Sequence, residues 1–215
     1  MPEVDVDRAV ALGASFGGYM MNWIQGHPLG KKFKALVCHD GIFSFTGLLA
    51  TEELYFPFYD LGGLPFYSRP KESETSEPDP RSAVARAEAI FSKTSLEDWD
   101  KNDPSKFLEH WSTPMLVIHG SKDYRLCISE GLAAFNVLQA RGIDSQFLAF
   151  PDENHFVLKP ENSLVWHKTV LNWLNAHVGL PRFSAEDDRG DAFYGGIEAP
   201  KEGDKDIPQS DVAAE

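Results

Sequence analysis

The sequence predicts an α/β fold in which a parallel sheet is covered by helices on both faces. Two observations support this prediction. The chain contains short, uninterrupted apolar runs, and these runs alternate with longer segments of helical periodicity. Uninterrupted apolar runs are typical of strands buried on both sides, and regular alternation of strand and helix is typical of parallel sheets.

The alternation starts close to the N-terminus. Residues 9–12 have the sequence Ala-Val-Ala-Leu, which predicts a buried strand. Residues 17–25 place Tyr, Met, Trp and Ile side chains on most faces of a helix, so this helix is expected at the centre of the fold. A second apolar run at residues 33–38 predicts the second strand.

The same alternation returns in the C-terminal half. Residues 115–118, Met-Leu-Val-Ile, predict the third strand. A helix is expected from 129 to 140 and is expected to end at Gly142, because glycine is the usual residue where a helix stops. Residues 146–150 predict the fourth strand, and residues 163–176 predict the last helix.

Two segments lack this pattern. Residues 61–81 are rich in Pro, Ser, Glu and Gly, which predicts a long surface excursion. Residues 181–215 combine an excess of acidic side chains with few large apolar ones, which predicts a disordered tail. The expected organisation is one folded domain at residues 1–180 followed by an acidic tail at 181–215.

The composition is that of one ordinary globular domain. Of the 215 residues, 42% are hydrophobic, and 33 acidic side chains against 20 basic ones give a formal net charge of −13. Nucleic-acid backbones and anionic membrane surfaces bind clustered Lys and Arg, so neither is expected as a partner. The N-terminal Met-Pro-Glu-Val-Asp-Val-Asp does not resemble a signal peptide, and no window is apolar enough for a membrane span.

The two cysteines, Cys38 and Cys127, are far apart and match no closely spaced metal-ligand pattern. A cysteine zinc site and a disulfide scaffold are therefore excluded, and no metal or cofactor is expected. Cys38 lies inside an apolar run, so two buried free thiols are expected. A single disulfide between them is the alternative.

The strongest local signal is Gly13-Ala14-Ser15-Phe16-Gly17, between the first expected strand and helix. This is the pattern G-x-S-x-G, in which small residues at both glycine positions allow a sharp turn that exposes the serine hydroxyl. The helix that follows directs its N-terminal N–H groups towards the place where an oxyanion would form, and the Phe16 N–H is the expected donor. Ser15 is therefore the candidate nucleophile.

A serine hydroxyl is a weak nucleophile unless a base accepts its proton, so a histidine and an orienting carboxylate are expected. Of the seven histidines, His155 alone lies in a loop directly after the last expected strand. The expected chain order of serine, acid and histidine makes Asp123, after the third strand, the candidate acid. Asp40, after the second strand, is the rival, because some hydrolases place the acid one strand earlier.

These segments resemble the prolyl oligopeptidase family of serine peptidases. Residues 13–20 have the family's second glycine and aromatic residue after the serine motif. His119-Gly120-x-x-Asp123-Tyr124-Arg125 is similar to its acid loop, and Asp152-Glu153-x-His155 is similar to its histidine loop. Residues 124–155 are most similar to the fungal dipeptidyl-peptidase V type, and the resemblance covers roughly residues 5–178.

The resemblance implies an α/β-hydrolase domain, represented by its C-terminal half, that cleaves short peptides. Ser15 would be the nucleophile, His155 the base, and Asp123 the acid that orients His155. The implied activity is that of a dipeptidyl-peptidase V-like serine peptidase. A carboxylesterase-type hydrolase and an inactive truncated fragment that acts only as an interaction module are the alternatives.

The resemblance also implies substrate-binding residues. Arg125 lies two positions after the acid, where family members hold a substrate carbonyl. Ile42, Phe43 and Phe45 lie where the family builds the pocket for the residue before the cleaved bond, with ordinary core packing as the alternative.

Ser15 lies much closer to the start of the chain than the resemblance leads us to expect. Family members carry a large β-propeller before the hydrolase domain, and that domain's early strands precede the serine motif. The propeller and these strands are therefore expected in the full-length protein and not in this chain. The resemblance is compatible with a secreted or a cytoplasmic protein.

Overall fold

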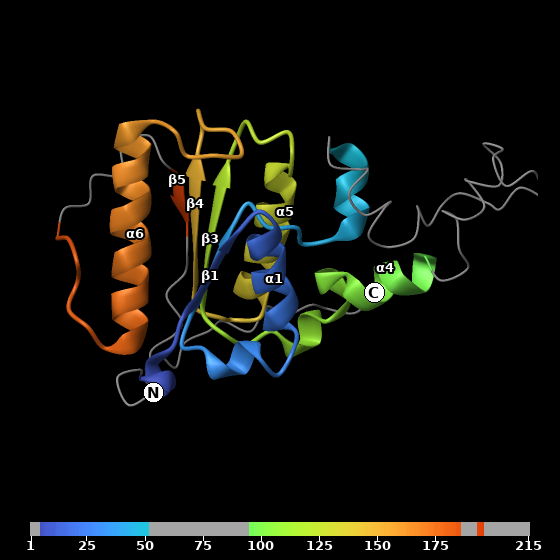
Figure 1. The fold of residues 1–215 in the computed structure, drawn as a ribbon, viewed down its shortest axis with the longest axis horizontal. Helices are drawn as coiled ribbons and strands as arrows, with labels where there is room; N and C mark the ends of the chain where they lie inside the picture. Colours follow the sequence, from blue (N-terminus) through green and yellow to red (C-terminus); the bar gives the residue numbers. More distant parts are fainter. Residues whose placement is uncertain (1–4, 52–94, 186–192, 196–215) are drawn as a thin grey trace, which may run out of the picture.

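The structure is a computed structural model that describes residues 5–51, 95–185 and 193–195 of the chain. The expected surface excursion at residues 61–81 lies outside the described residues. The centre is a sheet with the strand order β1-β2-β3-β4-β5 (Figure 1). Strands β1 to β4 are parallel, and β5 is antiparallel to β4. The strands are β1 (Ala11–Ala14), β2 (Leu36–His39), β3 (Met115–Gly120), β4 (Ser145–Phe150) and β5 (Phe193–Gly195).

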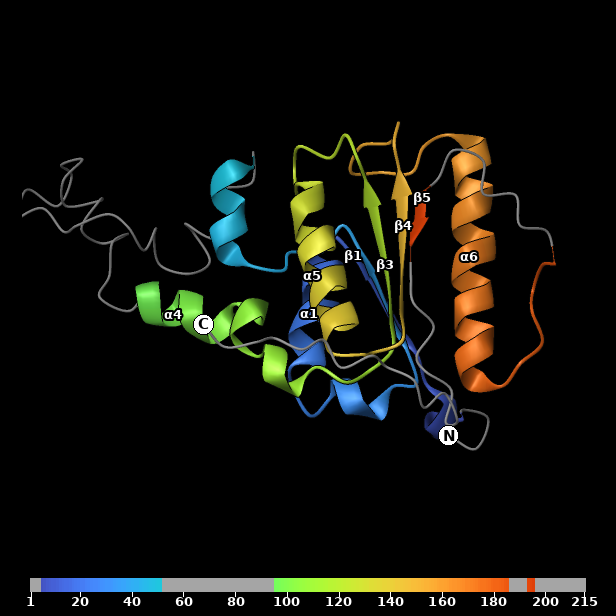
Figure 2. The ribbon, with the colours of Figure 1, turned by 180° about the vertical axis from the view of Figure 1, so that it is seen from behind.

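Helices cover both faces of this sheet. Figures 1 and 2 show α1 and α5 on one face and α6 on the other. The α-helices are α1 (Phe16–Gln25), α4 (Ser95–Asn102), α5 (Ile128–Ala140) and α6 (Pro160–Val178). Short 3₁₀-helices lie at η1 (Val6–Arg8), η2 (Gly30–Lys32), η3 (Phe45–Ala50), η4 (Pro104–Lys106) and η5 (Leu108–His110).

Alternate residues of the parallel strands face opposite sides of the sheet, as strand geometry requires. The core under α1 and α5 contains Met21, Ile24, Leu36, Cys38, Met115, Val117, Ala134, Leu138, Phe147 and Ala149. The core under α6 contains Ala35, Val37, Leu116, Ile118, Leu148, Phe150, Val165, Val170 and Trp173. Burial of one large aliphatic side chain contributes about 1.5–3 kcal/mol, so these two layers hold the helices against the sheet. The predicted α/β fold with helices on both faces is confirmed.

The N-terminal strands differ most from the prediction. β1 covers Ala11–Ala14 instead of residues 9–12, and its side chains alternate between half-buried and exposed. Leu12 is 44% exposed, because among the described residues β1 pairs with β2 alone. The prediction that this strand is buried is therefore wrong. β2 covers Leu36–His39 instead of residues 33–38.

The C-terminal elements follow the prediction closely. β3 and β4 contain the predicted runs and extend them slightly. Helix α5 ends at Ala140, and Gly142 has a φ of 65°, the left-handed conformation expected at a helix end. Helix α6 extends beyond both ends of the predicted segment 163–176.

Part of the segment predicted to be a disordered tail is ordered. Residues 193–195 form β5 and pair with β4, so the prediction is wrong for this strand. The Ser184 N–H donates to the Asn172 side chain of α6, whose amide group donates to the Ser184 carbonyl. Hydrogen bonds, which a composition argument does not register, therefore order these residues. Residues 186–192 and 196–215 lie outside the described residues.

Cys38 and Cys127 are free thiols, as predicted. Cys38 is buried, and burial together with the nearby Asp40 raises the pKa of its thiol to about 12. Cys127 is half-buried, at the start of α5, so the prediction of a buried thiol is wrong there.

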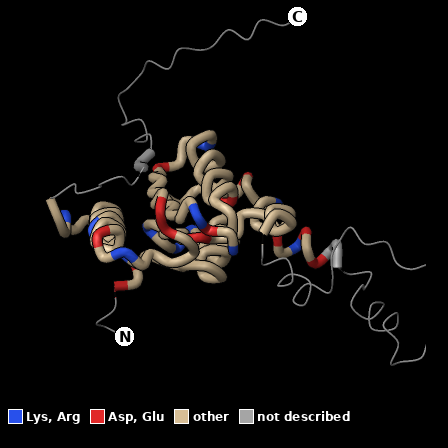
Figure 3. Tube along the Cα trace, turned by 90° about the horizontal axis from the view of Figure 1, so that it is seen from above, with Lys and Arg blue, Asp and Glu red and all other residues tan. Residues whose placement is uncertain are grey.

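Among the described residues, none of the helices combines the length and the apolar character that a membrane crossing needs. Figure 3, a view from above, shows Lys and Arg interspersed with Asp and Glu along the described part of the chain. The charges there are therefore distributed over several elements.

Candidate active site

Ser15 lies between β1 and α1 in a sharp backbone turn. Its φ is 57° and its ψ is −119°, a conformation that residues other than glycine rarely adopt. The Ser15 N–H donates to the carbonyl of His39 in β2 (3.0 Å), and the Ser15 carbonyl accepts from the N–H of Tyr19 in α1 (3.0 Å). These two bonds hold the strained residue between the sheet and the helix.

The turn also requires the absence of a side chain at Gly13. A Cβ atom there would lie 2.0 Å from the carbonyl oxygen of Gly17. At Gly17 a Cβ atom would meet nothing within 4 Å, so the steric requirement predicted for both glycines applies to Gly13 alone. Gly13 allows α1 to begin directly at the end of β1.

His155 lies in the loop between β4 and α6 and contacts two of the predicted residues. Its Nε2 is 2.9 Å from Ser15 Oγ, and its Nδ1 is 2.7 Å from Asp123 Oδ2. With the ring proton on Nδ1, the imidazole donates to Asp123, and Nε2 accepts from the Ser15 hydroxyl. The side chain of His155 is 7% exposed. The structure thus brings Ser15, His155 and Asp123 into one hydrogen-bonded chain.

Asp123 is fixed by backbone bonds as well as by His155. Its Oδ1 accepts from the N–H groups of Arg125 and Leu126, both at 2.9 Å. Burial alone would raise the pKa of Asp123, but the bonds from His155 and Leu126 outweigh this effect and lower it. The carboxylate is therefore held ionised and in one orientation.

The pKa of His155 is raised. Burial alone would lower it, as the nearby charge of Arg125 does, but the hydrogen bond and charge of Asp123, together with the charge of Asp40, outweigh both. The surroundings therefore favour the protonated ring, which is the form that a general base reaches after accepting a proton.

Asp40, the rival acid, lies at the end of β2 and close to the same ring. Its Oδ2 is 4.0 Å from His155 Nδ1, which is too long for a hydrogen bond. Asp123 is thus the acid that is bonded to the ring.

Phe16 and Arg125 are the other predicted residues next to this hydrogen-bonded chain: one follows Ser15 and the other lies two positions after Asp123. Phe16 is the first residue of α1, where N–H groups point out of the helix end. Arg125 is an exposed residue two positions after Asp123, and its charge reaches His155.

Two of the three predicted pocket residues are buried in the interior, and Phe43 is half-buried. Ile42 and Phe45 are 4% and 3% exposed, and the Phe45 ring stacks on Tyr19 with a centroid distance of 5.6 Å. Phe43 packs edge-on against Trp111. Such packing is typical of core residues, and a substrate-binding role for the three stays a prediction.

Two buried carboxylates that the sequence reasoning missed hold the backbone of the loop after β2. Glu130 Oε2 accepts from the N–H groups of Phe43 and Ser44, both at 2.8 Å. Asp103 Oδ2 accepts from the Ser44 hydroxyl and the Phe45 N–H, both at 3.0 Å. Burial raises the pKa of Glu130, an effect that the two backbone bonds oppose. The signal in the sequence that could have pointed to Glu130 is that it is the one charged residue of helix α5.

A third missed carboxylate, Glu153, supports the loop that carries His155. It is 3% exposed and accepts from the N–H groups of Leu158 and Lys159 and from the side chain of Asn162. These bonds attach the loop to the first turn of α6.

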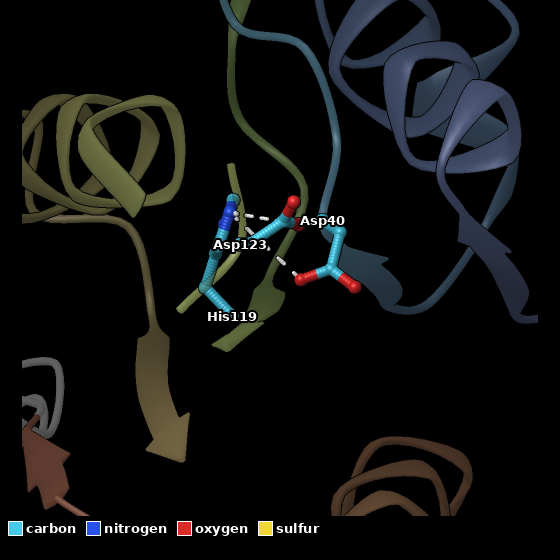
Figure 4. Close-up of side chains that lie close together, drawn as sticks. All are labelled: Asp40, His119 and Asp123. Carbon is cyan, nitrogen blue, oxygen red and sulfur yellow. Dashed lines mark ion pairs between the residues drawn. The ribbon is translucent and has the colours of Figure 1, made fainter. Parts of the chain in front are cut away.

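Among the described residues, Asp40, His119 and Asp123 place one potential metal-ligand atom each within 4.8 Å of the others (Figure 4). Each of them also has a hydrogen bond: His119 Nε2 lies 2.8 Å from the Leu126 carbonyl oxygen, Asp123 Oδ2 accepts from His155, and Asp40 Oδ1 accepts from the Gly120 N–H at 3.4 Å. The donor set could therefore hold a cation only by giving up bonds that fix Asp123.

The sequence model of the prolyl oligopeptidase family matches residues 2–181. The chain belongs to the prolyl oligopeptidase family. The sequence resemblance to this family is therefore confirmed.

Two fungal proteins are similar to this chain. It is 53% identical over 171 residues to dipeptidyl-peptidase 5 of Schizosaccharomyces pombe. This match covers 79% of this chain and 21% of that protein. It is 48% identical over 180 residues to a probable dipeptidyl-peptidase 5 of Aspergillus terreus, and this match covers 84% of this chain and 21% of that protein. The chain thus spans about a fifth of the length of these curated relatives.

Among solved structures, the chain is similar to Pyrococcus horikoshii acylaminoacyl peptidase, with a TM-score of 0.62 and 21% identity. The match covers 86% of this chain and 26% of that chain. This likeness supports the α/β-hydrolase fold of the prolyl oligopeptidase family.

Proposed function

We propose that this chain carries the catalytic portion of a serine peptidase that hydrolyses short peptides, with Ser15 as nucleophile. The single observation that supports the proposal most is the hydrogen-bonded chain from Ser15 through His155 to Asp123. Its members come from three separate loops, and the serine has a strained backbone. A merely structural serine would need neither feature.

In the acylation step, Ser15 Oγ attacks the substrate carbonyl carbon while its proton moves to His155 Nε2. The developing oxyanion accepts a hydrogen bond from the Phe16 N–H at the start of α1. His155 then donates the proton to the leaving amine, and the carbon–nitrogen bond breaks. Asp123 stabilises the imidazolium form during this transfer.

In the deacylation step, a water molecule takes the place of the amine. His155 accepts a proton from the water, whose oxygen attacks the acyl carbon. The proton then returns to Ser15 Oγ as the ester bond breaks, and the carboxylic acid leaves. The serine and the neutral histidine are regenerated.

The names of the fungal relatives point to release of dipeptides. Arg125 is proposed to hold a substrate carbonyl, and Ile42, Phe43 and Phe45 to contribute to the wall behind the residue before the cleaved bond. Residues 1–180 are proposed to be the catalytic domain. Because the relatives are about five times longer, a preceding propeller and further hydrolase strands are proposed partners of this domain.

The test is to treat the 215-residue chain with a fluorophosphonate, which reacts with activated serines, and to record its thermal unfolding. We expect a cooperative transition and labelling that Ser15→Ala abolishes. A folded chain without labelling contradicts the proposal and favours an interaction module. Labelling together with hydrolysis of simple esters but not of dipeptide amides favours the carboxylesterase alternative.

A further inference from the structure

Asp40 is a buried carboxylate that the proposed mechanism does not use. It is 1% exposed, and its φ of 48° lies in the left-handed region. Its Oδ1 accepts one long hydrogen bond, 3.4 Å, from the N–H of Gly120. Its Oδ2 has no hydrogen-bond partner among the described residues. A buried charge with so few hydrogen bonds destabilises the folded state, so its presence calls for another explanation.

Three histidines from three different segments face this carboxylate. His39 Nε2 of β2 lies 2.9 Å from Asp40 Oδ2, but the two atoms are not oriented for a hydrogen bond with each other. His119 Nε2 of β3 lies 3.8 Å from Oδ1 (Figure 4). His155 Nδ1 lies 4.0 Å from Oδ2. Two further titratable groups lie close to Asp40: the Asp123 carboxylate, with an oxygen within 4.8 Å, and the thiol of Cys38, two residues earlier in β2, whose pKa Asp40 helps to raise.

Of these three rings, His155 is the one whose charge changes during the proposed reaction. Asp123 faces it at 2.7 Å, Asp40 at 4.0 Å, and Arg125 acts on it with opposite sign. A fixed charge at 4 Å in a buried site interacts much more strongly than in water. Asp40 is thus placed to act on the His155 imidazolium without hydrogen-bonding to the neutral ring.

We propose that Asp40 is a positioning residue for His155: its carboxylate is a second counter-charge for the imidazolium that forms when His155 accepts the proton of Ser15. It is also the nearest alternative acceptor for the Nδ1–H if Asp123 is removed. This inference rests on the proposed function, because it concerns the same site.

The first test is an NMR titration of the histidine rings of the 215-residue chain, with and without Asp40→Asn. Asparagine tolerates left-handed backbone, so the substitution removes the charge and keeps the shape. We expect the pKa of His155 to fall by about one unit, a tenfold change in proton affinity. A pKa that stays within about 0.2 unit of the wild-type value overturns the proposal.

The matched control is Asp144→Asn. Asp144 pairs with His177 at 3.2 Å, before β4 begins. We expect this variant to lower the pKa of His177 and to leave the titration of His155 unchanged. An equal shift of His155 in both variants would mean that Asp40 acts through general destabilisation, which contradicts the proposal.

The second test is the rate of fluorophosphonate labelling as a function of pH. Asp40→Asn is expected to lower the plateau rate about tenfold and to move the acid limb to lower pH by about one unit. A purely structural role would reduce the amount of folded protein without moving the limb, and an unmoved limb overturns the proposal. If the wild-type chain is not labelled, the proposed function fails, and the NMR titration still decides the role of Asp40.

A third comparison decides the question if Asp40→Asn does not fold. Asp40→Gly also removes the carboxylate, and glycine readily adopts the left-handed backbone of this position. We expect the pKa of His155 to fall by about one unit in this variant as well. A pKa that stays within about 0.2 unit of the wild-type value would refute a role for Asp40.

Discussion

Two Asp–His pairs lie in different regions of the molecule, and one of them alone has the arrangement of a catalytic site. His155 Nδ1 is bonded to Asp123, and its Nε2 to the Ser15 hydroxyl. His177 Nε2 lies 3.2 Å from Asp144, and its Nδ1 lies 2.8 Å from the Trp173 carbonyl oxygen. In both pairs the carboxylate raises the histidine pKa against the effect of burial. The partner of the second ring nitrogen therefore distinguishes the two histidines, whereas the raised pKa is common to both.

The backbone explains this difference. His177 lies within α6, where a ring nitrogen reaches the carbonyl of the residue four positions earlier, as that of His167 in the same helix also does. His155 lies in a loop that offers its ring no such carbonyl among the hydrogen bonds described, so both nitrogens face side chains from other segments. A loop after a strand thus leaves both ring nitrogens of a histidine available for proton transfer. In a helix, one ring nitrogen is occupied by a backbone carbonyl.

The largest expected effect comes from removing the ring that faces the serine. We expect His155→Ala to lower the rate of fluorophosphonate labelling about 10⁶-fold, because His155 Nε2 is the partner that the Ser15 hydroxyl has in the described part of the chain. His177→Ala is the matched control and should change the rate by less than about threefold. Labelling of both variants at equal rates would contradict the assignment of His155 as the base.

The next effect comes from neutralising the carboxylate of the first pair. Asp123→Asn should lower the labelling rate about 10⁴-fold at neutral pH, because the amide favours the wrong ring tautomer. The neutral ring is the active base, so reactivity falls as the pH drops through the raised pKa of His155. Loss of the Asp123 charge should move this acid limb to lower pH in a pH–rate profile. An acid limb that moves to higher pH would contradict the stated cause of the shift.

A smaller effect should follow when the serine is displaced and the pair is left intact. Gly13→Ala would bring a Cβ atom to 2.0 Å from the Gly17 carbonyl oxygen, so the turn must shift. We expect a loss of about 1–3 kcal/mol in the free energy of unfolding and about a 100-fold slower labelling. Gly17→Ala, where a Cβ atom has open space, should change the unfolding free energy by less than about 1 kcal/mol. Denaturant unfolding of the two variants measures the difference, and equal destabilisation would argue against the steric explanation.

The smallest effect concerns the second pair. The Asp144 side chain is 41% exposed, so solvent screening limits the loss in Asp144→Asn to about 0.5 kcal/mol. Because the folded-state pKa of His177 is raised, the stabilisation is complete below the unfolded-state pKa and disappears as the pH rises through the folded-state value. Denaturant unfolding should thus separate the variant from the wild type near pH 5.5 and not near pH 9. A difference that grows with pH would reverse the sign and contradict this account.

The pattern of apolar runs predicted the strands around residues 115–118 and 146–150 well, because these strands are buried on both sides by helices of the same chain. It failed for β1, whose exposure depends on how many neighbours the strand has, and for β5, which is ordered by pairing with β4. Neighbours distant in the chain decide both cases, and composition contains no information about them.

The candidate site divides in a similar way. Ser15 is marked by a local motif, and His155 by its place after a strand. Glu130 and Asp103 belong to no local sequence motif, because each accepts hydrogen bonds from backbone N–H groups of a loop that is distant in the sequence. Ile42 and Phe45 matched the position of a pocket, while the structure places them in tightly packed interior.

The sequence by itself determined the alternation of strand and helix, the serine turn, and the order in which serine, acid and histidine follow parallel strands. The tertiary structure decided which carboxylate contacts His155. Asp40 and Asp123 follow adjacent strands and were both candidates, with Asp123 favoured, yet the sequence could not show that one lies at 4.0 Å and the other at 2.7 Å from the same nitrogen. A hydrogen bond no longer forms when the donor–acceptor distance grows by about one ångström. The paths of the two loops determine this distance, and no residue spacing in the sequence specifies those paths.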